Sequence, residues 1–173
     1  MILGMTLATF TLFHVVISLV GIASGLIVAY GLLGGKRFDT WTAIFLLFTV
    51  LTSVTGFFFP ITHLTPGLVV GVISLVVLAF AIFARYALNL NGIWRLAYVI
   101  SAMLALYLNV FVLVAQLFLK VPALKALAPT QSELPFKIAQ AVALTIFIVL
   151  GALATIKFRD EPARTERLRS AAA

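Results

Sequence analysis

The sequence predicts an all-α integral membrane protein, a bundle of five transmembrane helices with the N-terminus outside and the C-terminus in the cytoplasm. Composition is the first observation: the 173-residue chain is 64% hydrophobic and 10% charged, whereas soluble domains are about 45–50% apolar and about 25% charged. Its mean hydropathy is +1.22. The second observation is that five apolar runs reach the length of about 20 residues that a span requires. The third is that most charges flank these runs.

The predicted spans are bounded by residues that begin or end helices. Gly34–Gly35 is expected to end the first span, Asp39 or Thr40 to cap the second, and Pro60 to end it. Together the spans form one membrane domain, residues 1–156. We expect them at about 7–33, 41–59, 66–88, 93–119 and 136–156.

The later boundaries follow the same rules. Thr65–Pro66 places a capping residue before a proline at the first helical position of the third span. Asn89 and Asn91–Gly92 separate the third span from the fourth. Thr130 or Ser132, followed by Glu133, is expected to start the fifth.

The distribution of Lys and Arg predicts the orientation. With the N-terminus outside, nine basic residues fall on the cytoplasmic side and three on the outer side, in agreement with the positive-inside rule. The outer three are Lys120, Lys125 and Lys137. The cytoplasmic nine are Lys36, Arg37, Arg85, Arg95, Lys157, Arg159, Arg164, Arg167 and Arg169.

Compactness and short loops favour a bacterial inner membrane. The net charge of +7 is topological in this reading, so we expect no nucleic-acid partner. The tail 157–173 is interpreted as a solvated cytoplasmic segment, with a partner-binding arm as the alternative. The absence of cysteine excludes disulfides and thiolate chemistry.

Residues 120–135 are predicted to lie on the outer membrane surface as an amphipathic connector that breaks at Pro129. The alternative is a lid over a site beneath it.

Lys137 follows Glu133 at i+4, a spacing that favours an ion pair at the start of the fifth helix. At the other end, Arg85–Tyr86 and Trp94–Arg95 are typical of interface anchors, with binding of anionic lipid headgroups as the weaker alternative.

Polar residues within the spans gather in the outer half of the predicted bundle. Such residues usually face the bundle interior and form binding sites or interhelical hydrogen bonds. We therefore predict a polar pocket there, although hydrogen bonding between helices alone would explain the same pattern. The predicted ligand-binding residues are His14, Ser18, Ser53, Asn109, Gln116 and Gln140.

Helical spacing suggests how this pocket is assembled. Asn109, Gln116 and Lys120 share one face of the fourth span with Tyr98. His14 shares a face of the first span with Ser18, Gly21 and Gly25, and the two faces are expected to meet. Gly21/Gly25 and Gly67/Gly71 are small-xxx-small faces, which pack helices within one chain or join homo-oligomers.

The function predicted from these features is that of a membrane subunit or binding protein for a small or lipophilic ligand, possible partners being other membrane subunits. One alternative is a redox protein that holds haem b through His14 or binds a quinone, because histidine is the only strong axial ligand present. His63 lies in a short loop, at a different depth from His14. The sequence requires no cofactor and predicts no metal site.

Transport is the third hypothesis. The spans carry no Asp or Glu for proton coupling, which argues against a proton-coupled carrier and leaves transport of a small neutral solute. Catalysis has the least support: the chain contains no HExxH, no GxSxG and no phosphate-binding loop. We therefore expect no catalytic residues.

Overall fold

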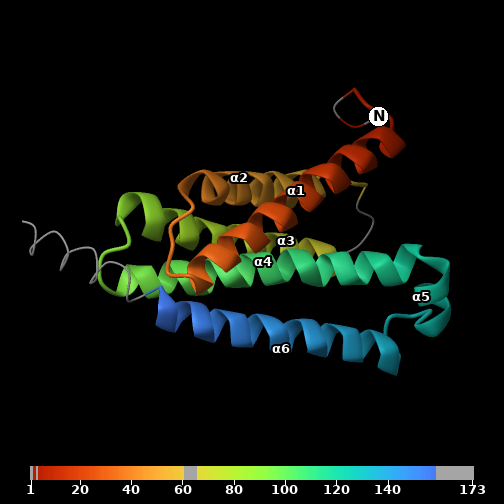
Figure 1. Ribbon diagram of the computed structural model, residues 1–173. Coiled ribbons are helices and arrows are strands. Elements are labelled where there is room, and N and C mark those ends of the chain that lie inside the picture. The colour runs from red at the N-terminus through yellow and green to blue at the C-terminus, as the bar shows by residue number, and fades with distance from the viewer. Residues whose placement is uncertain (1, 3, 61–65, 159–173) are drawn as a thin grey trace, which may run out of the picture.

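A computed structural model gives the structure of the protein, and the residues it describes are 2, 4–60 and 66–158. The predictions for Thr65, for His63 and for the tail after Phe158 lie outside these residues. Within the described part the protein is all-helical, and five helices are long and apolar enough to cross a membrane. Successive long helices run in opposite directions (Figure 1). The elements are α1 Leu7–Leu33, α2 Asp39–Gly56, α3 Pro66–Ile82, η1 Phe83–Ala87, α4 Ile93–Lys120, α5 Pro122–Leu127 and α6 Leu134–Lys157.

The helix ends agree with the predicted spans to within a few residues, with two informative differences. Gly35 adopts a positive φ of 68° directly after the C-cap Gly34, so the Gly34–Gly35 end of α1 is confirmed. The predicted cap of α2 is wrong: the N-cap is Phe38, which has no capping side chain, and Asp39 is already helical. The third span does not continue as a regular α-helix, because η1 is a π-helical turn.

The segment between the fourth and fifth spans contains a short helix, α5. Proline occupies the first position of α5. The N–H group that proline lacks would have no partner at this position, so proline is well suited to start a helix. The helix ends at Leu127, before Pro129, and none of its residues is buried. In Figure 1, α5 covers the end of the bundle where α4 finishes and α6 begins.

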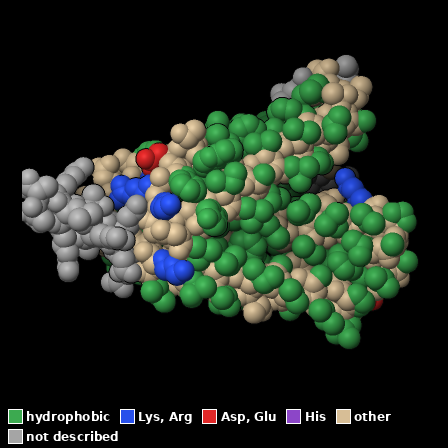
Figure 2. Space-filling view, in the orientation of Figure 1, with side chains coloured by type: hydrophobic (Ala, Val, Ile, Leu, Met, Phe, Trp, Pro, Cys, Tyr) green, Lys and Arg blue, Asp and Glu red, His purple; other side chains and the backbone are tan. Residues whose placement is uncertain are grey.

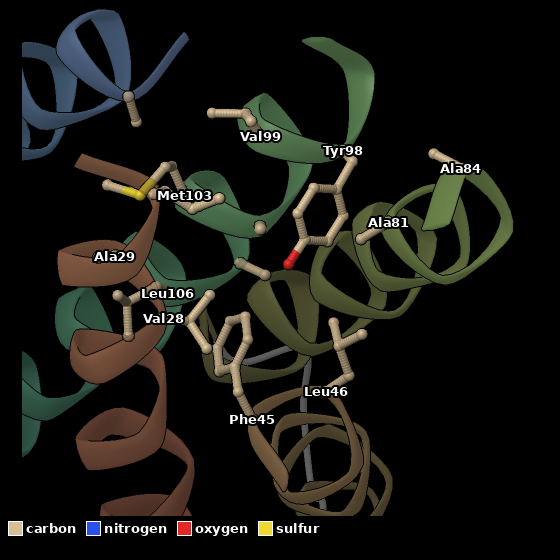
Figure 3. Packing of buried hydrophobic residues seen from close by; sticks show 14 of the residues in the cluster. Val28, Ala29, Phe45, Leu46, Ala81, Ala84, Tyr98, Val99, Met103 and Leu106 are labelled. Atoms are coloured by element: carbon tan, nitrogen blue, oxygen red, sulfur yellow. The ribbon is translucent and has the colours of Figure 1, made fainter. Parts of the chain in front are cut away.

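We call the two ends of the bundle the Lys120 end, where α1 begins and α4 finishes, and the Arg85 end, where α3 passes into η1. The packed interior is centred on α4, which contacts α1, α3, α5 and α6. Phe45, Leu106 and Tyr98 are each at most 1% exposed. Figure 3 shows the Tyr98 ring pointing from α4 toward α2 and α3, with Ala81 beside it.

The glycine stripe of α1 packs inside the chain. A Cβ added to Gly21 would lie 3.4 Å from Thr49 of α2, and one added to Gly25 would lie 2.6 Å from Leu106 of α4. Gly71 of α3 faces Phe57, whereas Gly67 is exposed. These contacts account for Gly21 and Gly25 without a second chain. An oligomer joined through either stripe stays a prediction.

Glu133 is the N-cap of α6, but its partners differ from those predicted. Its carboxylate accepts hydrogen bonds from the Thr130 hydroxyl at 2.8 Å and from the N–H groups of Thr130 and Ser132, each at 3.1 Å. No ion pair between Glu133 and Lys137 is found in the described structure. The carboxylate therefore closes the turn before α6 instead of pairing along the helix.

Titration of Glu133 should reveal this turn. Loss of hydration acts to raise the pKa of Glu133, but the hydrogen bonds from Thr130 and Ser132 together lower the pKa below its ordinary value. A lowered folded-state pKa means that the contribution to stability is present above the unfolded pKa and is lost as the pH falls through the folded pKa. Thr130→Val should raise the Glu133 pKa in a carboxyl ¹³C NMR titration. An unchanged pKa in that variant would contradict the hydroxyl contact.

Candidate functional site

His14 forms the best-defined polar contact near the Lys120 end. Its Nδ1 atom lies 2.8 Å from Thr55 Oγ1 of α2. The Thr55 hydroxyl donates its single proton to the Leu51 carbonyl at 2.7 Å, so it accepts from histidine. Nδ1 therefore carries the proton in the neutral ring. Nε2 is left as a lone-pair acceptor, for which the described residues supply no hydrogen-bond donor.

The surroundings of the His14 ring are aromatic on one side and basic on another. Phe59 contacts the ring edge-on at a centroid distance of 5.2 Å, and Phe10 packs on Phe59 at 5.1 Å. Lys120, the last residue of α4, is close enough to act on His14 electrostatically. We call His14, Thr55, Phe59 and Lys120 the His14 site. In Figure 2 the surface is notched between the beginning of α1 and the end of α4, with a positively charged side chain at the opening.

Asn109 belongs to a second contact, deeper in the bundle. Its amide nitrogen donates to Thr49 Oγ1 of α2 at 3.2 Å, and both side chains are buried. The His14 face does meet α4, through Gly25 and Leu106, but His14 and Asn109 do not bond each other. Helix α2 supplies both partners: Thr55 bonds His14 of α1 and Thr49 bonds Asn109 of α4.

The other predicted residues are dispersed. Ser18 donates to the carbonyl of His14 in its own helix at 2.6 Å, and Ser53 is buried on α2. Gln140 of α6 donates to the Phe111 carbonyl of α4 at 3.1 Å, while its Oε1 is buried without a partner in the described structure. Gln116 is exposed. These contacts join helices or satisfy the local backbone, so the structure does not bring the six predicted residues together in one pocket.

Three residues of the His14 site, Thr55, Phe59 and Lys120, were not among the predicted site residues. Thr55 follows Leu51 at i+4, a spacing at which a threonine hydroxyl usually bonds its own helix, as it does here. Its second role, as acceptor for His14, depends on the packing of α1 against α2. Helical spacing within α2 carries no signal for that contact.

Comparison of the chain with protein-family models, with curated proteins and with solved structures finds no match. Its function is therefore inferred from its own geometry.

Proposed function

We propose that this chain is a multi-pass protein of a bacterial inner membrane that binds a small or lipophilic ligand at the His14 site, as a binding protein or a membrane subunit. The proposal places the Arg85 end in the cytoplasm. The excess of Lys and Arg on that side supports this orientation. The five apolar helices support the membrane location.

The observation that carries the proposal is the His14 Nε2, for which the described residues supply no hydrogen-bond donor. Thr55 fixes the tautomer and the ring orientation, as a supporting hydrogen bond does for functional histidines. Nε2 accepts a hydrogen bond, and the nearby Lys120 ammonium donates one. A ligand headgroup with a hydroxyl and a second oxygen would satisfy both groups. Quinols have this chemistry, because one hydroxyl donates to Nε2 while the other hydroxyl oxygen accepts from Lys120, and their apolar tails are compatible with the lipid-facing helices.

The test compares His14→Ala with Ser18→Ala in purified protein reconstituted with decylubiquinol under reducing conditions. His14→Ala should weaken quinol binding about tenfold, the effect of losing a hydrogen bond of about 1.4 kcal/mol. Ser18→Ala should bind as the unaltered protein does, because the Ser18 hydroxyl is bonded within α1. Thr55→Val should give an intermediate loss by releasing the ring. Equal quinol binding by the His14→Ala and unaltered proteins would refute a quinol ligand at this site.

The same Nε2 favours haem b as the second candidate ligand, because an unprotonated imidazole nitrogen is a haem-iron ligand. Visible spectra of protein from haem-supplied cells, before and after dithionite, separate the two candidates. A Soret band that His14→Ala abolishes would identify a haem protein. Featureless spectra together with His14-dependent quinol binding would exclude haem and support the first candidate.

A further inference from the structure

The Arg85 end contains a hollow that the His14 site does not explain. Its volume is about 190 Å³. In Figure 2 basic and acidic side chains gather at this end of the molecule. We call this cavity the Arg85 hollow; its lining residues are Arg37, Asp39, Arg85, Tyr86, Asn89 and Leu90.

Arg85 is held rigidly at this hollow. Its side chain is only 7% exposed, an unusual position for a cation in a membrane protein. One guanidinium nitrogen donates to Asp39 Oδ1. The guanidinium lies 5.2 Å from the centre of the Tyr98 ring and 5.7 Å from that of Tyr86. Arginine has five N–H donors, so the contact with Asp39 leaves most of them available to a ligand.

The backbone around the hollow is irregular. Arg85 and Tyr86 belong to the π-helical turn η1, a feature frequently found at functional sites. Asn89 and Leu90 both adopt positive φ, 49° and 57°, which is sterically unfavourable for non-glycine residues. Such conformations cluster at binding sites, where surrounding contacts stabilise them. Leu90 is held by its N–H bond to the Ala84 carbonyl at 3.0 Å and is 2% exposed.

The start of α2 adds further attraction for an anion. Arg37 and Asp39 flank the N-cap residue Phe38. The Phe38 side chain has no oxygen that could accept hydrogen bonds from the N–H groups of the first turn. The positive end of the helix dipole therefore lies beside the hollow. Two arginines against one aspartate give the lining a formal charge of +1, and the Asp39 carboxylate is 79% exposed.

We propose that the Arg85 hollow binds a phosphate group, held by the remaining N–H donors of Arg85 together with Arg37. Planar guanidinium groups match phosphate oxygens in geometry and charge. The hollow lies at a bundle end, where helices that span a membrane would meet the headgroups. The phosphate therefore comes from an acidic phospholipid or from a soluble phosphate compound, and both present the same oxygens to the two arginines.

The test uses the full chain in nanodiscs and two matched variants, Arg37→Gln and Lys36→Gln. Both residues are exposed and each variant removes one positive charge, but only Arg37 lines the hollow. Native mass spectrometry would count phosphatidylglycerol retained from phosphatidylcholine nanodiscs that contain it. Thermal unfolding in pure phosphatidylcholine nanodiscs, with and without inorganic phosphate, would measure the soluble anion. Arg85→Lys, which keeps the charge but not the guanidinium fork, is the third variant.

Arg37→Gln and Arg85→Lys should each reduce retention of the bound species about tenfold, whereas Lys36→Gln should leave it unchanged. Loss of phosphatidylglycerol alone identifies a lipid headgroup, and loss of the phosphate-induced stabilisation alone identifies a soluble compound. Equal losses in Arg37→Gln and Lys36→Gln would show a general charge effect and overturn the proposal. Undiminished binding in both arginine variants, or the absence of binding by the unaltered protein, would also overturn it.

Discussion

Gly25→Ala is expected to lower the free energy of unfolding by about 2 kcal/mol, within the range found for overpacked cores. The new Cβ would lie 2.6 Å from Leu106 Cδ1 and 2.8 Å from Phe45 Cδ2. Both neighbours are 1% exposed, so neither has free space into which to move. Relief would require α1 to shift away from α2 and α4. Titration with SDS, monitored by circular dichroism, would measure the loss.

Gly21→Ala, one turn earlier on the same face, is the matched control. Its added Cβ would stand 3.4 Å from Thr49 Oγ1 and 3.5 Å from Thr49 N, which are ordinary contacts. Alanine also favours the helix over glycine, so stability should stay the same or rise by up to about 1 kcal/mol. Similar losses in both variants would contradict the packing of α1. A loss at Gly25 that depends on protein concentration would instead indicate an oligomer.

The spans could be predicted because their cause is local. A run of about 20 apolar residues is sufficient to span a bilayer, whatever its neighbours. The predicted limits of the first span, residues 7–33, agree with Leu7–Leu33. The least accurate limits are those of α2, which depend on an N-terminus with no side-chain cap at Phe38. The π-turn η1 inserts one residue into a helical turn, and nothing in its composition, FARYA, distinguishes it from an α-helix.

Contacts between helices were harder to predict from the sequence than the helices themselves. Periodicity shows which residues of α1 share a face with His14, but not which helix that face meets. The Asn109 face was expected to meet α1, and Leu106 on α4 does contact Gly25, but Asn109 itself bonds Thr49 of α2. Arg85 is the clearest example. The sequence indicates a snorkelling interface residue, whereas the structure buries it through Asp39, 46 residues away, and the Tyr98 ring.

Tyr98→Ala is expected to have the largest effect, a loss of about 3 kcal/mol in the free energy of unfolding. Tyr98 is 0% exposed and is the largest of the fully buried side chains among the described residues. Its removal opens a cavity that neither water nor lipid fills favourably. The ring also supports the Arg85 guanidinium, so the variant should retain less phosphate-bearing ligand as well.

Two further substitutions serve as controls. One tests whether the effect of Tyr98→Ala comes from the hydroxyl, and the other tests whether it depends on the buried position of the ring. Tyr98→Phe should unfold nearly as the unaltered protein does, because the buried hydroxyl makes no hydrogen bond of ordinary geometry in the described structure, although Thr42 and Arg85 lie close to it. Tyr107→Ala makes the same truncation at a partly exposed ring, which packs on Phe147 at 5.8 Å, so it should cost less than Tyr98→Ala. A large loss in Tyr98→Phe would mean that the hydroxyl holds a bound water or ligand atom. If Tyr98→Phe also lost phosphate binding, that atom would belong to the Arg85 hollow. Retained binding would place it in the core.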